Sequence, residues 1–253
     1  MILRNSVRVR IHVTTICLIL AGFVLAASLS RAASPPPGSE ESIKTEALKA
    51  GAALLQSNKP VEALGVYLDG FHFQNGHMDH QMEAHHYCAQ LSEDFIQCVL
   101  YDGTGKDARL IGIEYVVSEK LFKTLSEEEK KMWHSHVFEV KSGMLVAPGL
   151  PEAAEHELVS KLISTYGKTW HTWNMDSLDK GLPLGIPDLM MGFTAEGQMD
   201  PKLGAARESR LGISMDSRKK ARENIPAPAI QPGADAWMQG NVVELDLKAT
   251  GKK

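Results

Sequence analysis

The sequence lacks the short motifs that mark most catalytic and nucleotide-binding sites. It has no G-x-S-x-G nucleophile elbow, no H-E-x-x-H, no paired C-x-x-C and no G-x-x-x-x-G-K-[ST] phosphate loop. A G-x-G-x-x-G that follows a predicted strand is missing as well. These absences leave nucleophilic hydrolases and nucleotide-binding enzymes without local support, and no catalytic residue or nucleotide cofactor is assigned.

Net charge and cysteine are also low. The formal net charge is −4 over 253 residues, which gives no overall attraction for nucleic acid, so we expect no nucleic-acid partner. The only cysteines are Cys17, Cys88 and Cys98. The hydrophobic content of 43% is ordinary for a soluble globular domain, and no second copy of any segment indicates a repeat array.

The N-terminal segment differs from the rest of the chain. Three arginines precede the apolar run ICLILAGFVLAASLS, and Ser30 and Ala32 stand at the −3 and −1 positions of a predicted cleavage site. Residues 1–33 are therefore predicted to be a signal peptide. They could also be an uncleaved anchor, because the apolar run approaches the ~20 residues that span a bilayer. Both interpretations predict an exported protein, periplasmic or extracellular, and the second tethers it to a membrane.

Composition divides the remainder of the chain. Residues 34–42 are rich in Pro, Ser, Gly and Glu and are predicted to be a disordered spacer. Residues 43–230 carry the periodic apolar patterns of one folded domain. Residues 231–253 end in two lysines and are predicted to be a loose C-terminal tail.

Helical and extended patterns mix without regular alternation. Helices are predicted for residues 43–56, 61–71, 152–166 and 200–224. Strands are predicted for residues 109–118, 169–175 and 182–193, and a strand pair that turns at Ser142 and Gly143 is predicted within 134–149. This order predicts an α+β fold: a single domain with a mainly antiparallel sheet packed with helices.

Residues 85–101 predict a β-hairpin. A period of two runs on both sides of the SED loop, and Glu93 is the centre of that loop. In this register Cys88 lies directly opposite Cys98. One face, which carries Tyr87 and its alternate neighbours, is predicted to be core, and the other carries both cysteines.

Histidine is concentrated before this hairpin and in one H-x-H. An H-x-H on a strand places both imidazoles on one face, where a metal ion could take two ligands, and Glu83 or Glu139 could complete its shell. The candidate cofactor is a divalent metal such as zinc. The predicted ligands are His85 or His86 together with His134 and His136. Because the spacing matches no defined signature, exposed or hydrogen-bonded histidines are the alternative.

Cys88 and Cys98 have three interpretations. Opposed positions on a hairpin can bring the Cβ atoms within disulfide reach, and an oxidising compartment would favour the bond. The two residues could instead be small buried hydrophobic side chains, or thiols near a metal. Sequence periodicity does not distinguish among the three.

A basic stretch is the remaining candidate for a binding surface. Seven basic residues and two acidic ones lie between Lys202 and Arg222. Such a segment could meet the phosphate headgroups of a lipid surface. The alternative is an ordinary solvated helix face.

Several blocks of the sequence, in order, resemble the oil body-associated protein family. They are EAHHYCAQLSEDFIQC, ARLIGIEYVVSEKLF, WHSHVFEVKSGMLV, YGKTWHTW, LPLGIPDLMM and DPKL, and the match runs from about Leu64 to Arg222. The family includes plant seed members and related fungal and bacterial proteins that carry a domain of unknown function. The resemblance implies a role at lipid-droplet surfaces and supplies no catalytic residues. It also argues against the disulfide, because plant members that face the cytosol share the cysteine-bearing motifs.

Together these observations predict a non-enzymatic α+β domain, exported or membrane-tethered, that binds a lipid surface or an apolar ligand. A metal-dependent enzyme that uses the histidine cluster is the first alternative. A structural envelope protein is the second. The sequence does not indicate an oligomeric state.

Overall fold

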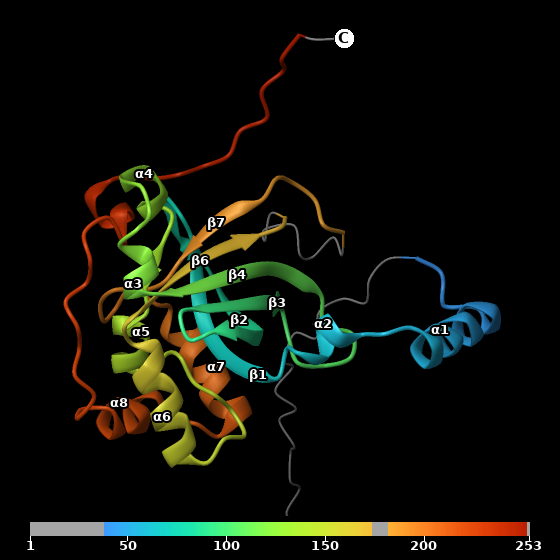
Figure 1. Ribbon diagram of the computed structural model, residues 1–253, viewed down its shortest axis with the longest axis horizontal. Helices are drawn as coiled ribbons and strands as arrows, with labels where there is room; N and C mark the ends of the chain where they lie inside the picture. Colours follow the sequence, from blue (N-terminus) through green and yellow to red (C-terminus); the bar gives the residue numbers. More distant parts are fainter. Residues whose placement is uncertain (1–37, 174–181, 252–253) are drawn as a thin grey trace, which may run out of the picture. The chain divides into compact units, whose positions relative to one another are not determined.

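The computed structural model describes residues 38–173 and 182–251, and the predicted leader, residues 1–33, lies outside them. The helices in these ranges are α1 (Ile43–Leu55), α2 (Lys59–Glu62), α3 (Glu119–Phe122), α4 (Glu127–Lys130), α5 (Val137–Ser142), α6 (Glu152–Leu162), α7 (Pro201–Leu211), α8 (Met215–Ala221) and the 3-10 helix η2 (Ala236–Gln239). The strands are β1 (Val66–Gln74), β2 (His77–Ser92), β3 (Phe95–Tyr101), β4 (Leu110–Ser118), β5 (His134–Ser135), β6 (Thr165–His171) and β7 (Asp188–Met191) (Figure 1).

All strand pairs are antiparallel, and the sheet closes on itself. Neighbouring strands follow the order β4-β3-β2-β1-β7-β6-β5, and β4 also pairs with β6 along the length of both strands. Six strands therefore form a closed ring, and the short β5 pairs with β6 beside it. In a closed sheet every second side chain of each strand points into the interior. The prediction of an α+β fold with a mainly antiparallel sheet is confirmed, whereas the closure has no counterpart in the sequence patterns.

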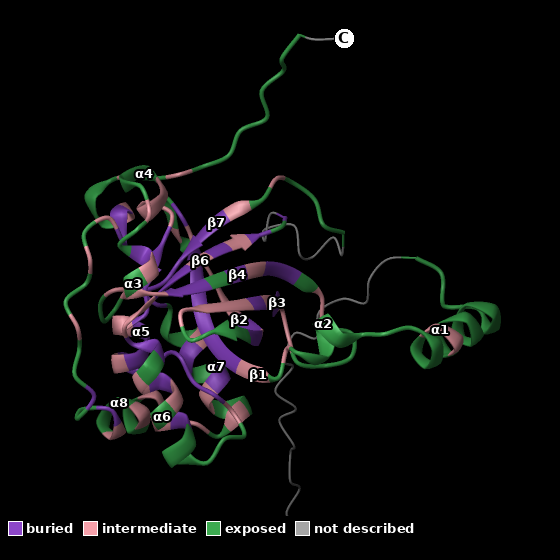
Figure 2. Ribbon diagram, in the orientation of Figure 1, coloured by how far each residue is buried: buried purple, intermediate pink, exposed green. Residues whose placement is uncertain are grey.

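Burial is concentrated in the strands of this ring, while the side chains of α1 are mostly exposed (Figure 2). One hydrophobic cluster joins the ring to two helices, because it contains Leu68 of β1, Leu100 of β3, Val140 of α5 and Val159 of α6. Burying one aliphatic side chain of this size contributes about 1.5–3 kcal/mol. The cluster therefore holds α5 and α6 against strands that also carry the candidate site.

In the β2–β3 hairpin the predicted register is confirmed at Cys88 and Cys98 and shifts next to the turn, where Ser92 pairs with Phe95, but the predicted core face is wrong. Cys88 pairs with Cys98 across the two strands. Their side chains are only 2% and 4% exposed, whereas Leu91, on the predicted core face, is 53% exposed and Tyr87 is half-buried. The reason is the closure of the sheet. The interior of the ring takes the face that carries His86 and the cysteines, and periodicity does not reveal an interior lined by polar side chains.

Two segments fold differently from the prediction. Instead of a helix through residues 61–71, α2 ends at Glu62 and the chain enters β1. Instead of a strand pair within 134–149, the two-residue β5 leads directly into α5. Gly143 has φ 80° and ends α5 as a left-handed C-cap, so it stops a helix and does not turn a hairpin.

The boundaries of the later helices also differ. The helix predicted for residues 152–166 ends at Leu162, because the following residues join the sheet as β6. The helical stretch 200–224 is divided by Gly212, whose φ of 65° ends α7. Within the predicted tail, 231–253, Trp237 packs on Phe73 with ring centroids 4.9 Å apart. The first part of that segment is therefore packed, and residues 244–251 are exposed.

Candidate metal centre

The interior of the closed sheet holds a cluster of histidine and glutamate side chains. Strand pairing brings its members together: Glu114 on β4 lies opposite Cys98 on β3 and Thr169 on β6. Residues directly opposite on antiparallel strands share one face of the sheet. The interior cluster consists of His72, His86, Glu114, His134, His136, Glu139 and His171, and each is at most 4% exposed.

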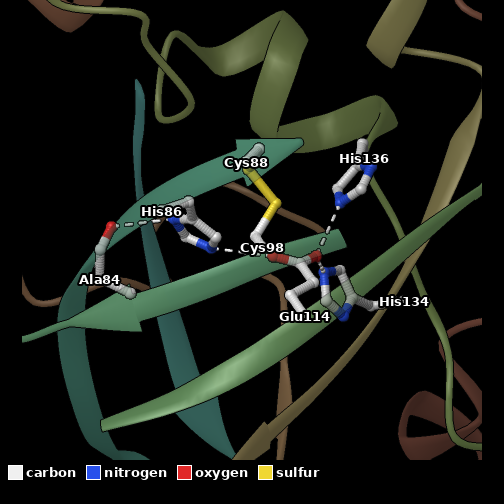
Figure 3. The surroundings of a disulfide bond; sticks show 7 residues. All are labelled: Ala84, His86, Cys88, Cys98, Glu114, His134 and His136. Atoms are coloured by element: carbon white, nitrogen blue, oxygen red, sulfur yellow. Dashed lines mark hydrogen bonds and ion pairs between the residues drawn. A yellow bond between two sulfur atoms is a disulfide. The ribbon is translucent and has the colours of Figure 1, made fainter. Parts of the chain in front are cut away.

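Glu114 lies at the centre of the interior cluster (Figure 3). Its Oε2 is 2.9 Å from His86 Nε2, and its Oε1 is 3.3 Å from His136 Nε2 and 3.5 Å from His134 Nε2. Burial opposes ionisation of Glu114, but the close approach of these three imidazoles holds its pKa well below the usual range. Glu114 is therefore a buried anion that three rings approach by the same nitrogen.

Two of these rings carry a proton on Nδ1. His86 Nδ1 is 3.0 Å from a backbone carbonyl, which can only accept. Thr165 donates its hydroxyl proton to another carbonyl at 2.6 Å, so it accepts from His136 Nδ1 at 2.8 Å. When the rings are neutral, both Nε2 atoms therefore turn a lone pair toward the oxygens of Glu114. Because a lone pair on nitrogen and a carboxylate oxygen repel each other, such contacts require a cation between them, which is either an added proton or a metal ion.

Several polar atoms around Glu114 have no hydrogen-bond partner among the described residues. They are Nδ1 of His72, both ring nitrogens of His134 and of His171, and Oε2 of Glu139. Leaving a buried polar group unsatisfied costs about 1–3 kcal/mol. A group of such atoms facing one centre indicates that the site accommodates a ligand.

Protonation of His72, His134 or His171 is an unfavourable way to supply a positive charge beside Glu114. Burial lowers the pKa of His72 and of His134, and it lowers the pKa of His171 to about 3. Burial, followed by the charge of Glu114, raises the pKa of Glu139 well above its usual range. At neutral pH the rings of His72, His134 and His171 are therefore neutral. A metal ion balances the charge of Glu114 better than a proton on any of these three rings.

A small cavity lies against part of the cluster, and two glycines bring the backbone close to its polar atoms. A cavity of about 20 Å³ is lined in part by His72, His86, Glu114, His136 and Glu139. This is enough for one occupant of the size of a water molecule. A Cβ atom on Gly167 would lie 2.7 Å from His134 Nε2, and one on Gly192 would lie 3.0 Å from Glu139 Oε2. These two glycines let the backbone approach the polar atoms closely.

The separations among the polar atoms match those of a coordination shell. Four tetrahedral ligands at about 2.0 Å from a zinc ion lie about 3.3 Å from one another. The three contacts of Glu114 bracket that value, and His134 Nε2 is 3.9 Å from Glu139 Oε2. Two overlapping groups, His72–Glu114–His134 and His134–His136–Glu139, each have ligand atoms within 4.8 Å of one another. His134 belongs to both.

Of the four predicted ligands, the structure brings together His86, His134 and His136, and it places His85 on the opposite face of β2. His85 Nδ1 is 2.8 Å from the hydroxyl of Tyr67 and 3.1 Å from Asp69 Oδ2. Asp69 is also 3.5 Å from a guanidinium nitrogen of Arg207 and 3.6 Å from one of Arg210. The two arginines already balance the charge of Asp69. The group formed by His85, Asp69, Arg207 and Arg210 is therefore an ion-pair network and not a second metal site.

The sequence analysis missed Glu114, His72 and His171. Glu114 offers one signal, because it is the only charged residue in the apolar strand LIGIEYVVS. A carboxylate in such a strand is rarely buried without a partner. His72 and His171 give no comparable signal, since a single histidine in a strand is equally compatible with an exposed position.

Cys88 and Cys98 form a disulfide beside the cluster (Figure 3). Their Cα atoms are 4.0 Å apart on paired strands. Cys98 also lines the small cavity that Glu114 and His136 line.

The basic stretch between Lys202 and Arg222 is not a uniform surface. Arg207 and Arg222 are buried, and each donates to backbone carbonyls of the segment that contains α5 and the residues after it. Arg222 also lies 3.1 Å from the buried carboxylate of Glu155. Part of this stretch therefore holds α7 and α8 to the domain and is unavailable to a phosphate headgroup.

Comparisons with known proteins identify relatives over most of the chain. A family described as "Protein of unknown function (DUF1264)" matches residues 58–226. Oil body-associated protein 1B of Arabidopsis thaliana is 41% identical over 211 residues, which cover 83% of this chain and 87% of that protein. Oil body-associated protein 1A of Zea mays is 41% identical over 219 residues, which cover 85% of this chain and 92% of that protein. No solved structure matches.

These relatives contradict the prediction of an exported or anchored protein. They are named for oil bodies, which are lipid droplets inside cells. The prediction rested on residues 1–33 alone, where three arginines, an apolar run and a predicted cleavage site have the pattern of a signal peptide. Residues 38–173 and 182–251 contain no helix with the length and apolar character needed to cross a bilayer.

Proposed function

We propose that this chain, which belongs to the oil body-associated protein family, binds one divalent transition metal ion, such as zinc, inside the closed sheet. Its relatives make it an oil-body-related protein of unknown biochemical function. The observation that carries the proposal is the buried Glu114 carboxylate, whose Oε1 faces Nε2 of both His134 and His136.

Glu114, His134 and His136 are the ligands that we assign to the ion. Imidazole nitrogen and carboxylate oxygen together suit zinc and its neighbours among the transition metals. The hydrogen bond of His136 is the one expected of such a ligand, because a metal-bound histidine usually donates its other ring N–H to an oxygen. Thr165 accepts that bond from His136. His86 Nε2 lies 2.9 Å from the second oxygen of Glu114.

The charge of a divalent ion fits the two buried carboxylates. Without an ion, burial and then the charge of Glu114 raise the pKa of Glu139 well above its usual range, which disfavours a second negative charge in this interior. A bound cation reverses this effect by favouring the ionised form of a nearby acid. Glu139 Oε2 would then be available as a fourth ligand next to His134.

The enclosure of the site supports a structural role for the ion rather than catalysis. The cavity of about 20 Å³ has room for one ion or one water molecule. A larger substrate could reach the ion only if strands separated. A bound ion instead joins β4 to β5 and the start of α5, a segment that follows β4 later in the sequence.

Elemental analysis of the purified full chain tests the proposal. We expect about one equivalent of zinc or a similar metal, retained through gel filtration, and loss of that metal in the double variant His134→Ala/His136→Ala. The matched control is His77→Ala/His80→Ala, because it also removes two histidines but from an outer part of the β1–β2 hairpin, where their rings stack 5.2 Å apart.

Two results would contradict the proposal. One is a wild-type chain that contains no metal and takes up none from added zinc, cobalt or manganese. The other is metal uptake that the control variant loses and the His134/His136 variant keeps, since the ion would then bind at the surface.

A second candidate function is association with the surface of lipid droplets, which the names of the relatives favour. The supporting feature of this chain is α1, where Ile43, Leu54 and Leu55 are 85%, 83% and 84% exposed. Apolar side chains exposed together on a helix are typical of segments that insert into the headgroup region of a lipid surface. This role and the metal site lie on different residues and are compatible.

Flotation with phospholipid-coated triacylglycerol droplets tests this second role. We expect the wild-type chain to float with the droplets and Leu54→Glu/Leu55→Glu to remain in the aqueous fraction. Leu245→Glu/Leu247→Glu is the matched control, because these leucines are also exposed but lie near the C-terminus. Equal flotation of both variants would exclude α1 as the lipid contact.

A further inference from the structure

We propose that the Cys88–Cys98 disulfide controls the composition of the metal site: when the bond is reduced, Cys98 becomes an additional thiolate ligand of the ion. This inference rests on the proposed metal binding at Glu114, His134 and His136. It concerns how the site is regulated and which ion it prefers.

The first observation is the position of Cys98 on the sheet. Cys98 is the direct partner of Cys88 on β2 and of Glu114 on β4, so the three side chains form a row across neighbouring strands. Partners in an antiparallel ladder share a face. The sulfur and the central carboxylate of the site therefore enter the same interior from adjacent positions (Figure 3).

The second observation is the small cavity. Cys98 lines it together with Glu114 and His136, two of the assigned ligands. Cys88 does not line this cavity, although it is also buried. The geometry therefore distinguishes the two sulfurs and assigns the ligand role to Cys98.

The chemistry of sulfur makes the disulfide a switch. A disulfide sulfur is not a ligand for zinc, whereas a thiolate is among its preferred ligands. A dithiol reductant would give two electrons and two protons to the bond, form its own disulfide, and leave thiols on Cys88 and Cys98. Binding of the ion then displaces the Cys98 thiol proton to water, as ligation of a thiol requires.

Reduction should change both affinity and selectivity. The oxidised site offers nitrogen and oxygen ligands, and the reduced site adds a soft sulfur ligand that favours zinc over manganese or magnesium. Loss of a supporting partner around a metal site commonly weakens binding about 10- to 100-fold. A direct ligand should have at least as large an effect, so we expect the reduced site to bind zinc at least about tenfold more tightly.

Cobalt(II) is the probe that tests this proposal, because a thiolate bound to it produces an intense charge-transfer band in the near ultraviolet. The experiment compares three full-length chains: the oxidised wild type, Cys88→Ser and Cys98→Ser. Each serine variant frees one thiol of the pair without added reductant, and Cys17 is present in all three chains, so the two variants form a matched pair. We expect the band in Cys88→Ser, together with tighter cobalt binding, and no band in the oxidised wild type or in Cys98→Ser.

Phosphine-reduced wild type provides a second measurement if a serine variant fails to fold, and it should show the same band as Cys88→Ser. Cobalt binding to all three chains without a band in Cys88→Ser or in the reduced wild type would overturn the switch and leave the metal site intact. Equal bands in both serine variants would overturn the assignment to Cys98. Absence of cobalt binding in every chain would overturn the metal site, and the switch with it.

Discussion

Replacing Glu114 by glutamine separates the metal hypothesis from its alternatives. Glutamine keeps the shape of the side chain but removes the charge that three imidazoles approach within 2.9–3.5 Å. In a chain without metal, the new amide N–H₂ can donate to the bare Nε2 atom of His136 or of His86. Because it also removes a buried anion, we expect the metal-free Glu114→Gln variant to be as stable as the metal-free wild type, or more stable.

In the presence of zinc, Glu114→Gln should instead be less stable than the wild type. A ligand present at 100 times its Kd stabilises the folded state by about 2.7 kcal/mol. For a domain of about 200 residues, 1 kcal/mol corresponds to about 2–4 °C in Tm, so zinc should raise the Tm of the wild type by about 5–10 °C. If loss of Glu114 weakens binding about 100-fold, the same zinc concentration gives about 0.4 kcal/mol, or about 1 °C.

Differential scanning fluorimetry with and without zinc measures this difference. The control is Glu127→Gln, which neutralises an exposed glutamate of α4 and should keep the full rise in Tm. A rise of 5–10 °C that persists in Glu114→Gln would refute the assignment of Glu114 as a ligand. A metal-free Glu114→Gln that is strongly destabilised would show that protons on the histidines balance the carboxylate when the ion is absent.

Further predictions follow from the same geometry. Gly167→Ala places a Cβ atom 2.7 Å from His134 Nε2, so it should lower stability by about 1–3 kcal/mol and abolish the zinc-dependent rise in Tm, whereas Gly105→Ala, with open space around its Cβ, should do neither in the same melts. Chelation with EDTA, followed by gel filtration, should lower the Tm of the wild type but not that of His134→Ala/His136→Ala. Burial raises the pKa of Asp235 from 3.8 to about 7, so the folded chain holds a proton that the unfolded chain releases, and this contribution to stability is present below pH 4 and lost as the pH rises to about 7. Asp235→Asn, which suits the φ of 52° and can still accept from the Ser135 N–H, should therefore flatten the fall in unfolding free energy between pH 4 and 7 as measured by urea titration; an unchanged slope would mean that other buried acids cause it.

The sequence by itself determined the local features that depend on neighbours along the chain. A period of two around Glu93 predicted the hairpin and the pairing of Cys88 with Cys98, and the structure has that register. The side chain of Ser42 caps α1, which begins where the helical spacing begins. The blocks shared with the oil body-associated proteins identified the family. Each of these conclusions uses residues that lie close together in the sequence.

Which face of the hairpin is interior was decided only by the tertiary structure. Alternation distinguishes two faces of a strand but does not say which one a closed sheet encloses, and here the enclosed face carries His86 and the cysteines. Prediction favoured the face with Tyr87, because apolar side chains usually form the core. A sheet that closes around polar side chains reverses that rule for its inner face.

The membership of the candidate site also depended on the fold. His86, His134 and His136 were predicted ligands, but the carboxylate that joins them, Glu114, comes from a strand between them in the sequence. The pairing of β4 with both β3 and β6 brings this carboxylate to the histidines. Sequence spacing identifies ligand types, whereas the distances of 2.9–3.5 Å that make a shared site arise only when six strands close into a ring.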